Sequence, residues 1–232
     1  MGCHAEATAP WSRGGVAAAA AFLERATELT PDPARRAARA LAAAQAKFEA
    51  AAPDTADELL SVAELGSLDD LQRAQAARLR AQIVFRRSRG SDAAALFLEA
   101  ARAFEGLDDG SARETYLEAF GAAMFAGQLG GRHGLREVAG AARAAPPGPQ
   151  PARPSDLLLD GMATRYLEHQ AVEAGAGEGA RAGVPTLRRA LEALRQENPC
   201  GRDDIMRLLR LSPMAQSMAA TFSPPRRARS YG

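Results

Sequence analysis

Five side chains carry the nitrogen or sulfur atoms that bind transition metals: Cys3, His4, His133, His169 and Cys200. A metal centre needs three or four converging ligands, and common centres show short spacings such as C-x-x-C or H-x-x-x-H. None of the five has such a spacing, and neither cysteine stands in a recognisable catalytic motif. We therefore expect no bound metal and no cysteine nucleophile.

Nucleotide chemistry has one loose candidate, the G-x-G-x-x-A match at residues 175–180. That fingerprint works only between a strand and a helix N-terminus, and no strand precedes it. Lys47 is the only lysine, and no glycine loop precedes it as a P-loop requires. A G-x-S-x-G nucleophile motif is also absent. We expect no cofactor and no enzymatic activity.

Neither the acidic pairs nor the basic segment of the sequence indicates catalysis or nucleic-acid binding. The adjacent pairs Asp69-Asp70, Asp108-Asp109 and Asp203-Asp204 would point about 100° apart on a helix, so they suit helix starts rather than acid–base work. Three arginines in the segment RRAR at 226–229 have no base-reading element beside them. The net charge is only +1, so we expect no direct binding to nucleic acid.

Composition indicates which elements position these residues. Alanine accounts for 55 of the 232 residues, whereas there are six valines, two isoleucines and eight threonines. Alanine favours helices, and strands need β-branched side chains, so an all-α fold is predicted. Two cysteines and no signal peptide indicate the cytoplasm, and the apolar stretch 14–23 is too short to span a membrane.

Capping residues and breakers divide the chain into helices. Asp32-Pro33 is typical of a helix start, Ser67 with Asp70 resembles a capping box, and Asp54, Ser91 and Ser111 are expected to begin three more helices. The predicted helices are 13–29, 33–51, 54–65, 68–87, 92–104, 111–126, 132–144, 155–170 and 183–196, with a weak tenth at 203–211.

The helices repeat at a period of 37 to 41 residues. Small residues recur in the first helix of each pair at Ala44, Ala81, Gly121 and Gly161, and in the second helix at Ala56, Ala93, Gly134, Ala63, Ala100 and Ala141. Aromatic residues recur at Phe48, Phe85, Phe125 and Tyr166. This alternation predicts a right-handed, tetratricopeptide-like solenoid of helical hairpins.

We expect five segments along the chain: an irregular segment 1–12, helical repeats 13–143, a Pro-rich linker 144–154, further repeat helices 155–211 with a Gly-rich insertion at 175–183, and a mostly disordered tail 212–232. In such solenoids the first helices line a concave groove for a peptide or protein. Groove candidates by spacing are Arg39, Gln45, Arg78, Gln82, Arg86 and Glu118; a solvated face without a ligand explains each equally well.

The runs GVAAAAAFLERATELTPDPARRAARALAAAQAKFEA, LDDLQRAQAARLRAQIVF, RGSDAAALFLEAARAFEGLD, ARETYLEAFGAAMFAG and PSDLLLDGMATRYLE resemble one family. It is the tetratricopeptide-like region of large LuxR-family transcriptional regulators of high-GC bacteria, and the resemblance covers about residues 14–212. That family's ATPase and helix-turn-helix modules have no counterpart here, and TFSPPRRARSYG does not match, so we interpret the chain as truncated.

The resemblance implies a non-enzymatic sensor and coupling segment that binds an effector or protein, including the family's ATPase and DNA-binding modules. The alternative is a free-standing adaptor that holds a peptide or protein partner in its groove. No catalytic or base-reading residue carries over from the family.

Overall fold

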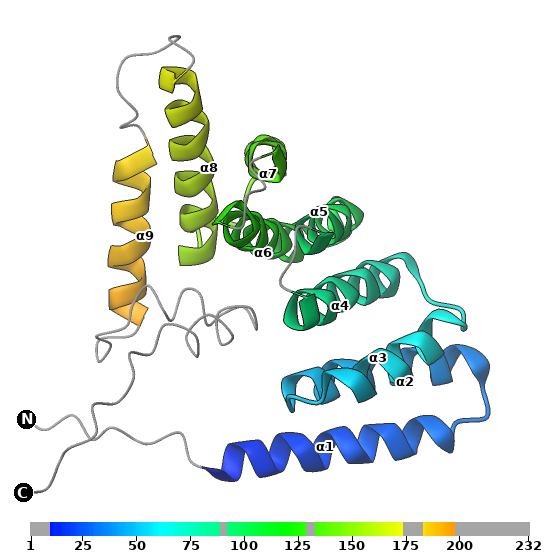
Figure 1. The fold of residues 1–232 in the computed structure, drawn as a ribbon. Helices are drawn as coiled ribbons and strands as arrows, with labels where there is room; N and C mark the ends of the chain where they lie inside the picture. Colours follow the sequence, from blue (N-terminus) through cyan, green and yellow to red (C-terminus); the bar gives the residue numbers. More distant parts are fainter. Residues whose placement is uncertain (1–9, 89–91, 129–132, 174–182, 198–232) are drawn as a thin grey trace, which may run out of the picture.

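The computed structural model describes residues 10–88, 92–128, 133–173 and 183–197, and within them every regular element is a helix (Figure 1). The helices are α1 (Pro10–Glu28), α2 (Pro33–Glu49), α3 (Pro53–Glu64), α4 (Asp70–Ser88), α5 (Asp92–Phe104), α6 (Asp109–Gln128), α7 (His133–Ala144), α8 (Pro154–Glu173) and α9 (Gly183–Glu197). The prediction of an all-α chain is confirmed over these residues.

Helix α2 begins as its sequence predicts. The Asp32 side chain accepts a hydrogen bond from the Ala34 backbone N–H at 3.2 Å, and Pro33 occupies the first helical position. Proline has no N–H to leave unsatisfied there, so it suits this position.

The start of α4 differs from the expected pairing of Ser67 with Asp70. Asp69 Oδ1 accepts from the Gln72 backbone N–H at 2.7 Å, and Gln72 Oε1 accepts from the Asp69 N–H at 3.1 Å. These reciprocal bonds form a capping box, which needs a carboxylate or hydroxyl followed three residues later by Glu or Gln. Gln72 completes that pattern for Asp69, and α4 therefore begins at Asp70.

Four other helices begin one to three residues before their predicted starts: α1 at Pro10, α3 at Pro53, α6 at Asp109 and α8 at Pro154. Helix α6 begins at Asp109 because the Asp108 carboxylate accepts from both the Ser111 N–H (3.0 Å) and its hydroxyl (2.7 Å). These bonds hold the pKa of Asp108 below its ordinary value. Helix α1 begins at Pro10, so residues 10–12, which were expected to be irregular, belong to a helix; residues 1–9 lie outside the described part of the chain.

Each helix packs mainly against its neighbours in the chain, and next-but-one contacts join α2 to α4, α5 to α7 and α6 to α8. Figure 1 shows α1 to α6 in successive layers, with α8 and α9 side by side and running across them. Residues 145–153 connect α7 to α8 without forming a helix. The contacts are therefore local in sequence and progress along the chain.

Alanine is the commonest buried residue in the described helices. The predicted small positions Ala44, Ala56, Ala63, Ala81, Ala93 and Ala100 are fully buried. At Gly161 an added Cβ would lie 2.7 Å from Leu187 Cγ, so α8 and α9 approach too closely there for a side chain. Gly134 is different: it is exposed and an added Cβ would meet nothing within 4 Å, so its predicted packing role is wrong.

Aromatic side chains fill the wider gaps. Phe48 and Phe85 are buried, whereas Phe125 and Tyr166 are half-buried. Phe85 and Phe125 meet edge to face with ring centroids 5.9 Å apart, and Phe120 and Tyr166 do so at 6.3 Å. Both contacts join helices two apart in the chain, α4 with α6 and α6 with α8.

Several expectations concern residues outside the described part of the chain. They are Ser91, the G-x-G-x-x-A segment 175–180, the tenth helix 203–211, the tail 212–232 and its arginines, and Cys3, His4 and Cys200.

Candidate functional site

The six groove candidates lie on three helices. Arg39 and Gln45 are on α2, Arg78, Gln82 and Arg86 on α4, and Glu118 on α6. Gln82 and Glu118 are buried, with exposed fractions of 5% and 3%. Neither of these two side chains is therefore available to line an open groove.

Glu118 is the centre of a buried polar contact between α4 and α6. Arg78 donates to both of its carboxylate oxygens, with Nε–Oε2 and Nη2–Oε1 distances of 3.1 Å, and Gln82 Nε2 donates to Oε1 at 3.0 Å. A bidentate arginine–carboxylate pair fixes orientation as well as distance. Burial lowers the pKa of Arg78, but Glu118 and Glu114 outweigh it and raise that pKa above its ordinary value, so the guanidinium stays charged.

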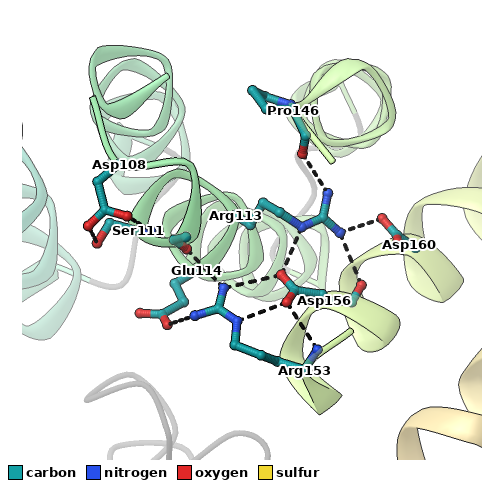
Figure 2. A network of polar contacts seen from close by, with 9 residues as sticks. Asp108, Ser111, Arg113, Glu114, Pro146, Arg153, Asp156 and Asp160 are labelled. Carbon is teal, nitrogen blue, oxygen red and sulfur yellow. Dashed lines mark hydrogen bonds and ion pairs between the residues drawn. The ribbon is translucent and has the colours of Figure 1, made fainter. Parts of the chain in front are cut away.

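The contacts continue from α6 to α8. Glu114 lies 3.6 Å from Arg78 through one oxygen, and its other oxygen accepts from Arg153 Nη1 at 2.8 Å. Arg153 precedes α8 and donates through Nε to Asp156 Oδ2 at 2.8 Å. A continuous row of charges of alternating sign therefore joins three helices. Figure 2 shows its part between α6 and α8, from Glu114 through Arg153 to Asp156.

Arg113 and Asp156 form the most buried ion pair of the described residues, with side-chain exposures of 4% and 2%. Arg113 Nε donates to Asp156 Oδ1 at 2.8 Å, and its two terminal nitrogens donate to the Pro146 carbonyl at 3.0 Å and to Asp160 Oδ1 at 2.6 Å. The guanidinium thus joins α6, the 145–153 connection and α8, as Figure 2 shows.

Burial tends to raise the pKa of the Asp156 carboxyl, but its hydrogen bonds from Arg153 and Arg113 outweigh burial and hold that pKa below its ordinary value. Gly148 completes the enclosure, because an added Cβ would lie 2.9 Å from Asp156 Cγ. We call the set Arg78, Gln82, Arg113, Glu114, Glu118, Arg153, Asp156 and Asp160 the ionic network.

The ionic network can hold helices together, and its geometry offers little for acid–base chemistry. Each carboxylate accepts hydrogen bonds or ion pairs from arginine. No buried side-chain nitrogen or oxygen in the described residues lacks a partner. Paired, fully charged groups of this kind stabilise one arrangement of the helices against others.

The other groove candidates have separate surroundings. The Arg86 guanidinium lies 4.5 Å above the centroid of the Phe48 ring and joins α4 to α2, a cation–π contact. Gln45 donates to Glu49 at 2.9 Å and is half-buried, and Arg39 is exposed and donates to the Thr30 hydroxyl. Arg39 and Gln45 are six residues apart, which places them about 120° apart around α2, so they do not share one face.

Sequence reasoning missed Arg113, Glu114, Arg153, Asp156 and Asp160 as members of one cluster. The spacing of these residues in the sequence contained a signal for the cluster. The pairs Glu114–Arg153, Arg78–Glu118 and Arg113–Asp156 are 39, 40 and 43 residues apart, close to one repeat. A search for opposite charges 37 to 41 residues apart would have found Glu114–Arg153 and Arg78–Glu118, but not Arg113–Asp156.

A hollow of about 400 Å³ lies beside α4, between the α3–α4 turn and α5. It is lined by Glu64, Gly66, Leu68, Arg73, Ala76, Ala77, Arg80, Leu96 and Glu99. Its two arginines are already engaged, Arg73 with Asp70 and Arg80 with Glu64.

Metal and membrane candidates gain no support in the described part of the chain. His169 is exposed on α8, and no group of three His, Cys, Asp or Glu side chains among the described residues could hold a metal ion. None of the described helices combines the length and the apolar character needed to cross a bilayer.

Comparison with known proteins adds no relative: no family model matches the chain, and neither a curated protein nor a solved structure is significantly similar to it.

Proposed function

We propose that the chain is a right-handed, tetratricopeptide-like solenoid that acts by binding a protein, as the sensor section of LuxR-family regulators does. The observation that carries this proposal is the set of inter-helix contacts one repeat apart. Arg86 reaches Phe48 across 38 positions, and Arg78 reaches Glu118 across 40. Contacts at offsets near one repeat are typical of stacked hairpins, where each unit is covered by the next.

The ionic network gives the proposal a mechanism. It ties α4, α6 and α8 together through charges that are costly to leave unpaired. These helices therefore shift together, and a partner that prefers one packing changes the population of the whole stack. The resemblance to LuxR-family regulators supports this role, since their helical section lies between the ATPase and DNA-binding modules.

We place Arg39 on the surface that binds the protein partner, because it is the groove candidate that remains exposed on a first helix. The chain itself neither hydrolyses nucleotides nor reads DNA, and it works in the cytoplasm, in line with its scarce cysteine. The alternative is an adaptor of the same fold that serves a partner unconnected with transcription.

The proposal is tested with the purified full chain and the separately expressed ATPase and DNA-binding modules of a related regulator. We expect calorimetry to detect saturable binding to one of these modules, with blank ATPase and gel-shift assays for the chain alone. Arg39→Glu weakens that binding. Arg102→Glu, the same charge reversal at a half-exposed side chain of α5, does not.

Nucleotide turnover or saturable DNA binding by the chain alone would contradict the proposal. Tight binding only to a protein unrelated to transcription would favour the adaptor.

A further inference from the structure

Two arginines of α2 are held against the α1–α2 turn by neutral oxygens. Arg36 donates through Nε to the Thr30 carbonyl and through Nη2 to the Pro31 carbonyl, both at 2.8 Å. Arg39 Nη1 donates to the Thr30 hydroxyl, which itself donates to the Ala26 carbonyl at 2.6 Å. Because Thr30 is only 4% exposed, both guanidiniums are anchored to a fixed part of the fold.

The positive charges of Arg36 and Arg39 are not neutralised within the described chain. Neither guanidinium has a described carboxylate at ion-pairing distance, and the carbonyl and hydroxyl groups that accept from them carry no net charge. The carboxylates nearest to them in the sequence already pair with other cations: Glu24 with Lys47, Glu28 with Arg25 and Asp32 with Arg35. The first part of α2 therefore carries an excess of positive charge.

Arg35 adds a third guanidinium to this side of the helix. Residues three and four positions apart are neighbours on a helix, so Arg39 lies next to both Arg36 and Arg35. The Arg35 side chain is 81% exposed, and its 3.7 Å contact with Asp32 is too long for a direct hydrogen bond. Like charges at these spacings repel each other and lower the stability of the helix. A bound anion would relieve that repulsion, and it would find free donors on Arg36 Nη1 and on Nε and Nη2 of Arg39.

We propose that Arg35, Arg36 and Arg39, here called the arginine patch, bind an acidic segment of the protein partner. The inference rests on the proposed role in binding a protein and names what that partner presents at Arg39. Arg35 and Arg39 are about 6 Å apart along the helix axis. Side chains two residues apart in an extended peptide lie about 7 Å apart on one side. A segment with Asp or Glu at alternate positions therefore presents carboxylates at the spacing of the patch.

The anchoring of the arginines favours this kind of ligand. A guanidinium binds a carboxylate through parallel N–H donors, which fixes the orientation of the pair. Side chains that are already held in place lose less conformational freedom when the ligand binds. Arg36 and Arg39 are held in this way by the turn, so the patch is prepared for a carboxylate before the partner arrives.

The confinement of the charge favours a peptide over a nucleic acid. The next cation along α2, Lys47, is neutralised by Glu24 at 2.6 Å, and Arg25 on α1 is neutralised by Glu28. A nucleic acid presents a phosphate at every nucleotide and binds most strongly to an extended track of cations. Residues 35–39 provide a short positive surface instead, which suits a short acidic segment.

The test measures peptide binding to the purified full chain by fluorescence anisotropy. One labelled peptide alternates glutamate with serine, and its control alternates glutamine with serine. We expect saturable binding of the glutamate peptide, with a dissociation constant lower than that of the glutamine peptide by about tenfold or more. Added salt should weaken this binding, because the patch is exposed to solvent. Equal affinity for both peptides would overturn the proposal, as would tighter binding of a single-stranded oligonucleotide with the same number of charges.

Variants of the patch locate the binding site. Arg36→Gln and Arg39→Gln should each raise the dissociation constant of the glutamate peptide by about threefold to tenfold, because each removes a charge and its donors. Arg35→Gln should act in the same direction, and it leaves the hydrogen bonds of the α1–α2 turn intact. Arg102→Gln is the matched control, because it removes the same charge from a half-exposed side chain that pairs with Glu137.

Circular dichroism of each variant should match the parent, which shows that a loss of binding is not a loss of folding. Peptide binding that tolerates Arg35→Gln, Arg36→Gln and Arg39→Gln, or that Arg102→Gln weakens equally, would overturn the arginine patch.

This proposal and the proposed function can fail separately. If a module of a related regulator binds the chain but the glutamate peptide does not, the protein-binding role stands and the acidic segment is wrong. If the peptide binds through the arginine patch but no regulator module binds, the acidic segment stands and the link to LuxR-family regulators is wrong.

Discussion

Arg113 and Asp156 bring a full positive and a full negative charge into the interior between α6 and α8. Removing charges from water is costly, and the cost is offset only when both partners are present and their remaining hydrogen-bonding groups are satisfied. Here Asp160, Arg153 and the Pro146 carbonyl complete those bonds. The pair therefore specifies how α6, α8 and their connection fit together.

Asp156→Asn is expected to lower the free energy of unfolding by about 3–5 kcal/mol at pH 7, because it leaves a buried guanidinium with less compensation. The folded-state pKa of Asp156 lies below its unfolded value, so its contribution is complete above the unfolded pKa and is lost as the pH falls through the folded one. Urea titrations at pH 7 and below about pH 4 should show the difference shrinking in acid. A difference independent of pH would contradict this account.

The capping box at α4 gives a second test at the scale of single residues. Asp69→Ala removes the acceptor for the Gln72 N–H and should cost about 1 kcal/mol. Ser67→Ala is the control, because Ser67 is exposed and outside the box; it should change the unfolding free energy by less than about 0.5 kcal/mol. Equal losses in chemical denaturation would show that the cap is assigned to the wrong residue.

At the scale of the elements, the order of the helices in the described part of the chain could be predicted from the sequence, because Pro, Gly and Asp mark their ends and alanine is frequent within them. The tenth expected helix lies outside that part. The helix starts are predicted less accurately. The sequence favours Ser67 and Ser111 at the starts of α4 and α6, whereas Asp69 and Asp108 provide the capping oxygens. Several oxygen-bearing side chains lie close together at both starts. Which of these oxygens accepts a hydrogen bond from an unpaired backbone N–H depends on the three-dimensional geometry of the helix start. Helix existence follows from composition, whereas capping depends on local geometry.

Replacing a glycine by alanine should destabilise the protein on α8 and stabilise it on α7. Gly161→Ala forces a Cβ to within 2.8 Å of two Leu187 side-chain carbons and should separate α8 from α9, destabilising by about 1–3 kcal/mol. Gly140→Ala on α7 meets nothing within 4 Å and should stabilise by up to about 1 kcal/mol, because alanine is the better helix former. Thermal unfolding of both variants checks the sign; stabilisation by Gly161→Ala would contradict the close α8–α9 contact.

The groove candidates show why a site is harder to predict than an element. Arg78, Gln82 and Glu118 lie on α4 and α6, but spacing cannot tell whether a polar side chain faces solvent or a neighbouring helix. In the structure these three bind one another. Charge pairs one period apart hold the helices together, and a count of residues along one helix does not reveal them.

At the scale of the whole molecule, packing between helices adjacent in the chain dominates, and contacts one repeat apart supplement it. Arg78–Glu118 joins α4 to α6, and Glu114–Arg153 with Arg113–Asp156 joins α6 to α8. The ionic network therefore runs from α4 through α6 to α8. This continuity is what the proposed sensor role requires of the chain.

The most direct test of this packing is a double-mutant cycle on Arg78 and Glu118, the pair that spans one repeat between α4 and α6. With Arg78→Met and Glu118→Gln, we expect a coupling energy of about 0.5–3 kcal/mol in chemical denaturation. Arg78→Met combined with Glu28→Gln, far away on α1, should be additive within about 0.5 kcal/mol. Additive effects of Arg78→Met and Glu118→Gln would contradict the account, because the two helices would then not meet one repeat apart.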